Sequence, residues 1–180
     1  MSPPHVRLRP PKVIDAPALA DEADDYRVAR TLRDYFPHPY SVDDALRFIE
    51  EAQAKTGPAT QFVIEADGEV AGIMGLFVGE DVYRRNGEIG YWLGRRWWGR
   101  GIATAAVRLV VDYAFGQLGL TRVYAEVFGT NVASLRVLEK AGFTLEYRLP
   151  AVIVKDGEVL DLVAMGRRKS AQDWSRTSTS

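Results

Sequence analysis

Hydrophobic residues change their spacing several times along the chain, and each change predicts a new element of secondary structure. Val6 and Leu8 alternate with polar neighbours, which predicts a short strand. Apolar residues then recur every three or four positions over residues 16–33, which predicts a helix. A second helix is expected after Ser41, because Asp44 completes a capping box with it and an apolar face follows.

The middle of the chain carries the alternation and the turn residues of β-structure. Two apolar runs flank the pair Asp67-Gly68, a strong signal for a hairpin. A second turn is expected at Asn86-Gly87, leading into a third strand. Residues 102–118 then show an apolar stripe at helical spacing, which predicts a long helix.

The last third of the chain predicts a strand in "TRVYAEVF", a short helix in "NVASLRVLEKAG" and a final hairpin around "KDGEV". The strand–helix–strand order around residues 102–118 implies a parallel strand pair inside an otherwise antiparallel sheet. The predicted fold class is therefore mixed α/β. We expect one domain over residues 1–170, followed by a flexible polar tail over 171–180.

Composition narrows the classes of function. The 180 residues are 47% hydrophobic and 26% charged with a formal net charge of -1, so no global charge points to a nucleic acid or an anionic membrane. The absence of cysteine excludes disulfides and thiolate chemistry. No apolar run has the length of a signal peptide or membrane span, and the histidines lack metal-ligand spacing, so we expect a cytoplasmic protein without a metal.

One segment does not fit regular packing, because Gly99-Arg100-Gly101 interrupts an apolar run just before the helix expected from Ile102. Each glycine costs about 0.5–1 kcal/mol relative to alanine inside a regular element, so another requirement is expected there. A helix start exposes backbone N–H groups and partial positive charge, and two missing side chains would let an anion approach them. Three nearby arginines add full positive charge: Arg95, Arg96 and Arg100.

This combination suits a phosphate or pyrophosphate. The alternative is a tight strand–helix turn with surface arginines, and the loop alone leaves both interpretations open. The absence of Gly-Lys-Ser/Thr disfavours a P-loop, and the absence of Gly-x-Gly-x-x-Gly disfavours a dinucleotide site. The backbone groups expected to contact the anion follow the loop, at Ile102, Ala103 and Thr104.

The segment from Arg96 to Gly101, "RWWGRG", and three longer stretches together form a specific pattern. The stretches are "PYSVDDALRFIEEA", "EIGYWL" and "RVYAEVFGTNVASLRVLEKAGF". The pattern resembles the GNAT superfamily of N-acetyltransferases, whose Gln/Arg-x-x-Gly-x-Gly/Ala signature cradles the pyrophosphate of acetyl-CoA. It is most similar to the Rim-type branch of ribosomal-protein N-terminal acetyltransferases, and it runs from "VRLRP" to "LDLVAMGR".

The resemblance implies a fold and a cosubstrate. The fold would be a mostly antiparallel sheet with a central splayed parallel pair, flanked by about four helices. The activity would be acetyl transfer from acetyl-CoA to a primary amine, without a metal. The acetyl-pantetheine arm would lie along the strand from Glu88 to Gly94, with backbone groups near Leu93 pairing its amides and polarising the acetyl carbonyl.

Asn131 and Ser134 match two residues with roles in Rim-type enzymes. The resemblance implies that Asn131 holds the pantetheine arm and that Ser134 stands near the sulfur as a candidate proton donor. From spacing alone, Asn131 is equally a helix N-cap and Ser134 an ordinary first-turn residue. Many family members carry a tyrosine acid where this chain has Leu138, so Ser134 or water must protonate the sulfur here.

Two carboxylates are candidates for the general base that takes a proton from the amine. Glu88 precedes the glycine loop and Glu126 lies on the neighbouring strand, and either can act directly or through a water molecule. We favour Glu88. The alternative for both is an ordinary charge on the solvent face of the sheet.

The leading hypothesis is an acetyl-CoA-dependent N-acetyltransferase whose acceptor is a protein N-terminal α-amine or a small-molecule amine. An alternative of another class is a catalytically inactive module that senses coenzyme A or binds a partner. Nucleic-acid binding through the arginines at 95–100 is not favoured, because the chain lacks a basic face. The acceptor and the oligomeric state are not fixed by the sequence.

Overall fold

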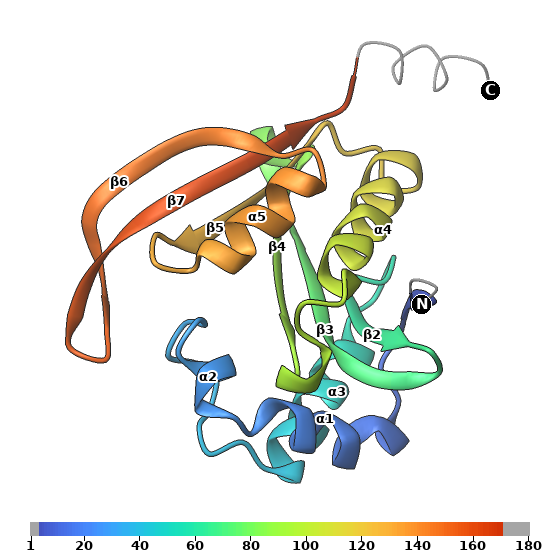
Figure 1. Cartoon of the computed structure of the whole chain (residues 1–180). Coiled ribbons are helices and arrows are strands. Elements are labelled where there is room, and N and C mark those ends of the chain that lie inside the picture. The colour runs from blue at the N-terminus through green and yellow to red at the C-terminus, as the bar shows by residue number, and fades with distance from the viewer. Residues whose placement is uncertain (1–3, 171–180) are drawn as a thin grey trace.

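A seven-stranded sheet organises the computed structural model, which describes residues 4–170 (Figure 1). The strands lie in the order β1-β2-β3-β4-β5-β7-β6. Their bounds are β1 (Val6–Arg9), β2 (Gln61–Ala66), β3 (Glu69–Val78), β4 (Asn86–Leu93), β5 (Arg122–Phe128), β6 (Thr144–Lys155) and β7 (Glu158–Arg168). The tail expected over 171–180 lies outside the described residues, and the single domain over 1–170 stays a prediction.

Within residues 4–170 the structure has five α-helices, one of them a single turn. Their bounds are α1 (Ala16–Ala23), α2 (Tyr26–Ala29), α3 (Val42–Ala54), α4 (Ile102–Gly116) and α5 (Val132–Lys140). None of the helices in this range combines the length and apolarity needed to cross a membrane.

β4 and β5 form the expected parallel pair in an otherwise antiparallel sheet. Their pairing covers only three register positions, from Asn86 opposite Arg122 to Glu88 opposite Tyr124. Beyond this point the two strands diverge (Figure 1), while β4 stays paired with β3 as far as Leu93. The mixed fold class with a splayed central pair is therefore confirmed.

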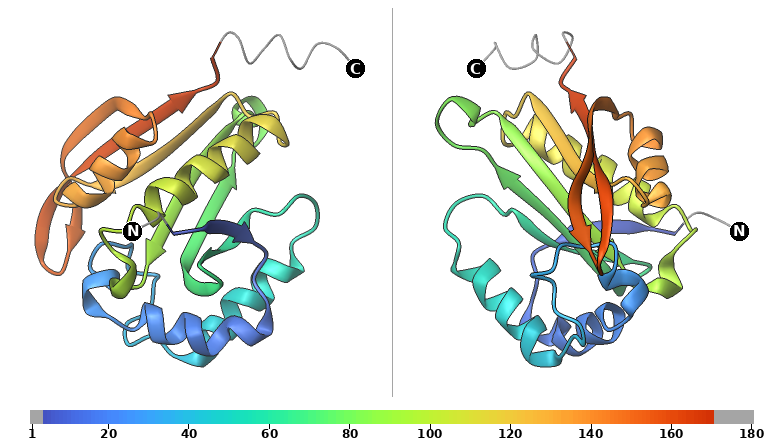
Figure 2. Two further views of the ribbon diagram at one scale, coloured as in Figure 1. Left: turned by 45° about the vertical axis from the view of Figure 1, so that its right-hand side comes forward. Right: turned by 90° about the vertical axis from the view of Figure 1, so that its left-hand side faces the viewer.

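Helices cover both faces of the sheet, because side chains alternate along each strand. In β2, Ile64 belongs to the core cluster formed with α4 and α5, while its neighbour Val63 belongs to a second cluster with α1 and α3. Figure 2 shows α4 and α5, in yellow and orange, on the opposite side of the sheet from α1 and α3, in blue and cyan. A residue's place in the alternation therefore gives its face.

The prediction of a helix over residues 16–33 is wrong in one respect, because the segment forms two helices instead of one. α1 ends at Ala23, and α2 begins after Asp25, whose carboxylate accepts the N–H of Arg27 at 2.7 Å. Asp24 accepts the N–H of Tyr40 at 2.9 Å. Aspartates favour such breaks because they bind nearby backbone N–H groups. The segment therefore forms two helices, α1 and α2.

The turn expected at Asn86-Gly87 is wrong. The chain reverses earlier, through a 3-10 helix at Asp81–Tyr83, and both residues lie at the start of β4. Gly87 is needed for close packing, since a Cβ there would lie 2.7 Å from the side chain of Leu76 and 2.8 Å from that of Leu120. The glycine serves the core, which a local turn signal does not reveal.

Two other local predictions are confirmed. Asp67 and Gly68 form the β2–β3 turn with φ of 50° and 86°, the left-handed values of a tight hairpin. Ser41 accepts the N–H of Asp44 at 3.2 Å, and the Asp44 carboxylate accepts the N–H of Ser41 at 2.9 Å. The capping box therefore starts α3 as expected.

Candidate active site

The glycine loop before α4 holds two residues in the left-handed conformation. The φ angle is 71° at Gly99 and 77° at Gly101, values that side chains rarely adopt. A Cβ added at either position would meet no atom within 4 Å. The backbone of this loop is therefore bare.

The first turn of α4 has no cap from the protein. Its first hydrogen bond is that of the Ala105 N–H to the Gly101 carbonyl, at 3.1 Å. Within residues 4–170, no acceptor receives the N–H of Ile102, Ala103 or Thr104. These donors and the dipole of a 15-residue helix together form a site suited to an anion.

The three arginines around the loop have different partners. Arg96 binds Glu22 of α1 and Glu69 of β3, the latter at 2.9 Å, so two carboxylates already neutralise it. Arg95 and Arg100 are exposed and have no acidic partner in the described part of the chain. Arg96 therefore anchors the loop to α1, and the other two arginines supply uncompensated positive charge.

The edge of β4 that faces β5 has no strand partner after the third register pair. Gly94 donates its N–H to Ala71 on the β3 side at 2.9 Å, and main-chain groups alternate between the two edges of a strand. The backbone groups of Tyr91 and Leu93 therefore point toward β5. The Trp98 indole donates to the Leu93 carbonyl at 2.9 Å, so this carbonyl already has a partner, while the Leu93 N–H lies on an edge of β4 that has no strand partner there.

The predicted base and acid residues come from opposite faces of the sheet. Glu88 and Glu126 alternate with strand residues of the α4–α5 core cluster, so they lie on the α1–α3 side. Asn131 and Ser134 belong to the start of α5, on the other side. The diverging strands β4 and β5 lie between the two sets.

Glu88 and Glu126 share one cation, which sequence reasoning did not find. Nη2 of Arg33 lies 2.8 Å from Glu88 and 3.2 Å from Glu126. Tyr147 donates its hydroxyl to Glu126 at 3.1 Å. Burial, with the two carboxylates, raises the pKa of Tyr124 above its ordinary value, so this phenol keeps its proton at neutral pH.

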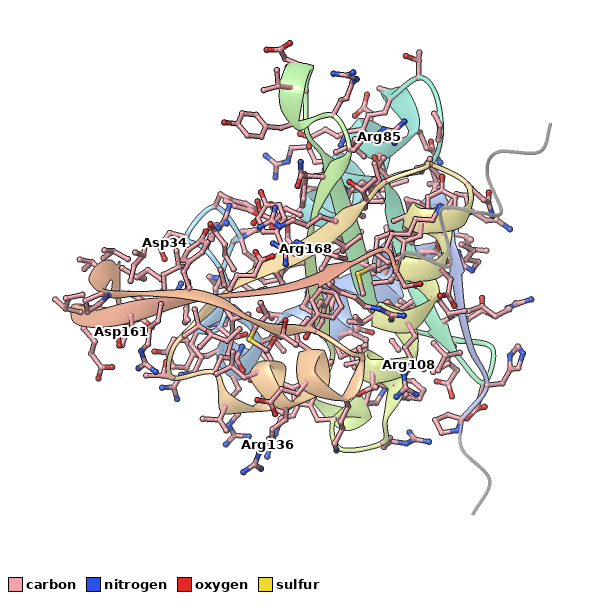
Figure 3. All side chains as sticks on the ribbon, turned by 90° about the horizontal axis from the view of Figure 1, so that it is seen from above. Asp34, Arg85, Arg108, Arg136, Asp161 and Arg168 are labelled. Atoms are coloured by element: carbon pink, nitrogen blue, oxygen red, sulfur yellow. The ribbon has the colours of Figure 1, made fainter. Side chains whose placement is uncertain are left out.

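A cavity of about 400 Å³ lies beside Glu126, between the segment after α2 and the β6–β7 hairpin. Lys155 of the hairpin binds Asp34 at 2.7 Å, which ties the hairpin to that segment; Asp34 is labelled in Figure 3. The charged residues lining the cavity are of both signs, and the rest of its wall is apolar. The apolar lining consists of Phe128, Val152, Ile153, Val154 and Leu162.

The start of α5 combines a cap with an unexpected hydroxyl pair. Oδ1 of Asn131 accepts the N–H of Ser134 at 3.2 Å, so Asn131 is an N-cap. The Ser134 hydroxyl lies 2.8 Å from the hydroxyl of Tyr91 in β4. Burial raises the pKa of Tyr91 to about 12. Leu138 is fully buried and apolar.

A family model described as an acetyltransferase (GNAT) domain matches residues 5–144. This range holds the glycine loop, the β4–β5 pair and α5, and it is more than half of the chain. The chain belongs to the GNAT acetyltransferase family. It is therefore an acyltransferase of the N-acetyltransferase class, as the sequence motifs implied.

Relatives of this GNAT acetyltransferase include curated and structurally solved proteins. The probable N-acetyltransferase YjcK of Bacillus subtilis (strain 168) is 39% identical over 111 residues, 59% of this chain and 61% of the relative. The spermidine N(1)-acetyltransferase of Escherichia coli (strain K12) is 29% identical over 137 residues, 76% of this chain and 73% of the relative. The solved structure of Mycobacterium smegmatis RimJ in complex with CoA-disulfide is 28% identical, with a TM-score of 0.79 over 97% of this chain and 85% of that one. The predicted resemblance to Rim-type enzymes is thus confirmed.

Two residues that contact the predicted site residues escaped sequence reasoning. Arg33 follows a one-turn helix, and no local pattern gives the direction of the chain there. Tyr91 stands in "EIGYWL", where strand alternation puts it on the face opposite Glu88. That alternation was a usable signal, but only the fold brings Tyr91 to Ser134.

Proposed function

We propose that this N-acetyltransferase binds acetyl-CoA at the start of α4 and transfers the acetyl group directly to a primary amine, on a protein N-terminus or a small molecule. The main support for this proposal is the uncapped first turn of α4, which follows two glycines in the left-handed conformation. The RimJ relative solved with CoA-disulfide supports this ligand. The proposed contacts of the diphosphate are Arg95, Gly99, Arg100, Gly101, Ile102, Ala103 and Thr104, while Arg96 contributes by anchoring the loop.

The residues present fit a diphosphate and its extended arm. Free N–H donors and two uncompensated arginines match an anion with several oxygens. The unpaired edge of β4, with the Leu93 N–H, offers hydrogen bonds to an amide-bearing chain lying along it. Asn131 caps α5 with its carbonyl oxygen, which leaves its amide nitrogen to bind the arm.

When bound, acetyl-CoA supplies a thioester whose carbonyl carbon accepts the amine. Glu88 takes the surplus proton from the incoming ammonium on the α1–α3 side of the sheet. The Leu93 N–H donates to the carbonyl oxygen as charge builds there. Ser134 gives a proton to the departing sulfur on the α4–α5 side. No covalent acyl-cysteine is involved, because the sequence has no cysteine.

Glu88 is preferred over Glu126 as the base because of its position. It occupies the last register pair before β4 and β5 diverge, next to the proposed path of the thioester. Glu126 accepts a hydrogen bond from the Tyr147 hydroxyl in addition to its contact with Arg33. The cavity beside Glu126 supports an acceptor that carries an apolar group near its amine.

Release of free thiol from acetyl-CoA tests the function. The acceptor panel contains a peptide with a free N-terminus, the same peptide with a blocked N-terminus, spermidine and a simple monoamine, with acetylated products identified by mass spectrometry. We expect turnover with at least one free amine and none with the blocked peptide. Absence of amine-dependent thiol release over the panel would contradict the proposal.

The base assignment is tested with Glu88→Gln. We expect kcat to fall about 100-fold, the usual scale for a lost general base. Glu80→Gln, an exposed change in the turn before β4, is the matched control and should leave kcat unchanged. A Glu88→Gln enzyme of full activity would remove Glu88 from the mechanism and leave Glu126 or water as the base.

A further inference from the structure

Tyr91 and Ser134 form a hydroxyl pair that joins β4, one of the two diverging strands, to α5. They are 43 residues apart in sequence, on β4 and α5, and their oxygens lie 2.8 Å apart. Tyr91 is partly buried and packs against the core cluster on the α4–α5 side. Ser134 is held independently, because its N–H binds the side chain of Asn131.

The chemistry of the two hydroxyls favours one direction for this hydrogen bond. A phenol is a stronger acid than an alcohol, so the phenol is the better donor and the alcohol the better acceptor. With Tyr91 donating, the proton of Ser134 is free to point elsewhere. Within residues 4–170, no side-chain or backbone group other than Tyr91 forms a hydrogen bond with the Ser134 hydroxyl.

We propose that Tyr91 is a positioning residue for the acid step: its hydroxyl donates to Oγ of Ser134 and so directs the proton of Ser134 to the departing sulfur. This inference rests on the proposed function, in which Ser134 protonates the leaving group. It adds a residue that does not itself touch substrate. It also gives a role to a buried hydroxyl that core packing does not require.

The proton balance of the step closes. The amine nitrogen forms the new C–N bond, and the electron pair of the broken C–S bond stays with sulfur. Ser134 transfers its hydroxyl proton to that sulfur and recovers one from water, while the Tyr91 hydrogen bond stabilises the negative charge that builds on Oγ. Nitrogen loses two protons in all: Glu88 passes the surplus proton of the ammonium to solvent, and then takes the second proton, which nitrogen releases as the C–N bond forms. Through water, this second proton replaces the one that Ser134 gave to sulfur, so the net products are an amide, a thiol and one proton released to solvent.

Tyr91 keeps its own proton throughout this step. Burial raises the pKa of Tyr91 to about 12, so the phenol stays a donor at any pH used for assay. Loss of the hydroxyl therefore removes a constant hydrogen bond. The effect of losing this hydrogen bond therefore depends on whether the leaving group must be protonated as it departs.

The test uses the full chain and compares kcat for two acetyl donors that differ in their leaving group. Tyr91→Phe keeps the ring and removes the hydroxyl; Tyr113→Phe is the matched control, because it removes a hydroxyl that donates to the Ala59 carbonyl at 2.8 Å beside the same core cluster. The substrates are acetyl-CoA and its selenoester analogue, whose selenolate leaves without a proton. We expect Tyr91→Phe to lower kcat about tenfold with acetyl-CoA, the scale of one hydrogen bond to developing charge.

With the selenoester the same variant should stay within about twofold of the wild type, and KM for acetyl-CoA should change less than kcat. Tyr113→Phe should behave as wild type with both substrates. Equal losses of Tyr91→Phe on both substrates, or no loss on either, would overturn the inference, since a structural role does not distinguish leaving groups.

Ser134→Ala gives a second route that does not depend on Tyr91→Phe folding. It should show the same selective loss with acetyl-CoA, and adding Tyr91→Phe to it should lower kcat no further. Two outcomes would overturn the inference: additive losses in the double variant, or a Ser134→Ala variant that loses as much kcat with the selenoester as with acetyl-CoA. In both cases the proposed function still stands as long as the wild-type enzyme shows amine-dependent turnover. A wild-type enzyme without amine-dependent turnover overturns the proposed function itself, and this inference with it.

Discussion

The guanidinium of Arg33 lies 2.8 Å from the carboxylate of Glu88, and the same nitrogen lies 3.2 Å from Glu126. One cation therefore serves two carboxylates on the face where the acceptor amine is proposed to arrive. The Arg33 side chain is half exposed, so an incoming ammonium can exchange with it at low cost. Arg33 thereby offsets part of the negative charge of the two carboxylates.

Replacing Arg33 with glutamine should shift acceptor selectivity toward amines with two or more positive charges. Two carboxylates without their shared cation attract a polycation more than a monocation, so we expect the kcat/KM ratio of spermidine to a monoamine to rise about tenfold. Steady-state kinetics measures the ratio. Arg27→Gln, an exposed change in α2, is the control and should leave it unchanged. An unchanged ratio in Arg33→Gln would mean that the acceptor does not meet these carboxylates.

Arg100→Gln should weaken coenzyme A binding more than Arg96→Gln does. Arg96 is already neutralised by Glu22 and Glu69, whereas Arg100 has no acidic partner among residues 4–170. We expect a loss of about fivefold to tenfold for Arg100→Gln and about twofold for Arg96→Gln, measured by titration calorimetry at low salt. The reverse order would show that Arg96 leaves its carboxylates to bind the ligand.

Glu65 should contribute to the loss of stability in acid. Hydrogen bonds from Arg9, whose Nε lies 2.6 Å away, and from Arg7 lower the pKa of this buried carboxyl below its ordinary 4.5. A lowered folded-state pKa stabilises the fold above the unfolded value, and this stabilisation disappears as the pH falls through the folded value.

Glu65→Gln should therefore lower the free energy of unfolding by about 1.5–3 kcal/mol at pH 7 and flatten its decline between pH 5 and 3. Urea unfolding at several pH values measures both. Glu51→Gln, an exposed change in α3, should reproduce the wild-type pH profile. A Glu65→Gln profile parallel to the wild type would remove this carboxyl from the acid response.

Gly87→Ala should destabilise the fold although both residues are small. The added Cβ would lie within 3 Å of Leu76 and Leu120 in the core, so we expect a loss of about 1–3 kcal/mol in the free energy of unfolding. Gly90→Ala on the same strand is the matched control, since its Cβ would approach only Phe77, at 3.9 Å. Equal stabilities of the two variants would contradict the packing role of Gly87.

Sequence reasoning succeeded where neighbouring residues decide the structure. The capping box at Ser41 and the hairpin at Asp67-Gly68 depend on contacts within a few residues, and both are confirmed. Gly99 and Gly101 were singled out because they interrupt regular structure, and both have a left-handed backbone; their part in binding an anion stays a prediction.

Prediction failed where distant packing decides. Asn86-Gly87 carries turn residues, but Gly87 is required by side chains from β3 and the α4–β5 connection. Arg33 and Tyr91 reach their partners only through the tertiary fold, across 55 residues to Glu88 and 43 residues to Ser134. Such contacts cannot be predicted from the spacing of residues along the chain. The residues that contact the proposed acid and base could therefore be identified only from the structure.

The central claim is that the bare start of α4 binds the diphosphate of coenzyme A. The most direct test measures the affinity of the Gly101→Val variant for coenzyme A and for pantetheine, which lacks the diphosphate. Gly57→Val is the matched control, because Gly57 also has a left-handed φ of 92° and open space around it, in the loop after α3. We expect Gly101→Val to lower coenzyme A affinity at least tenfold, to leave pantetheine binding within about twofold, and to stay folded, while Gly57→Val binds both as wild type does. Wild-type affinity of folded Gly101→Val for coenzyme A would contradict the account.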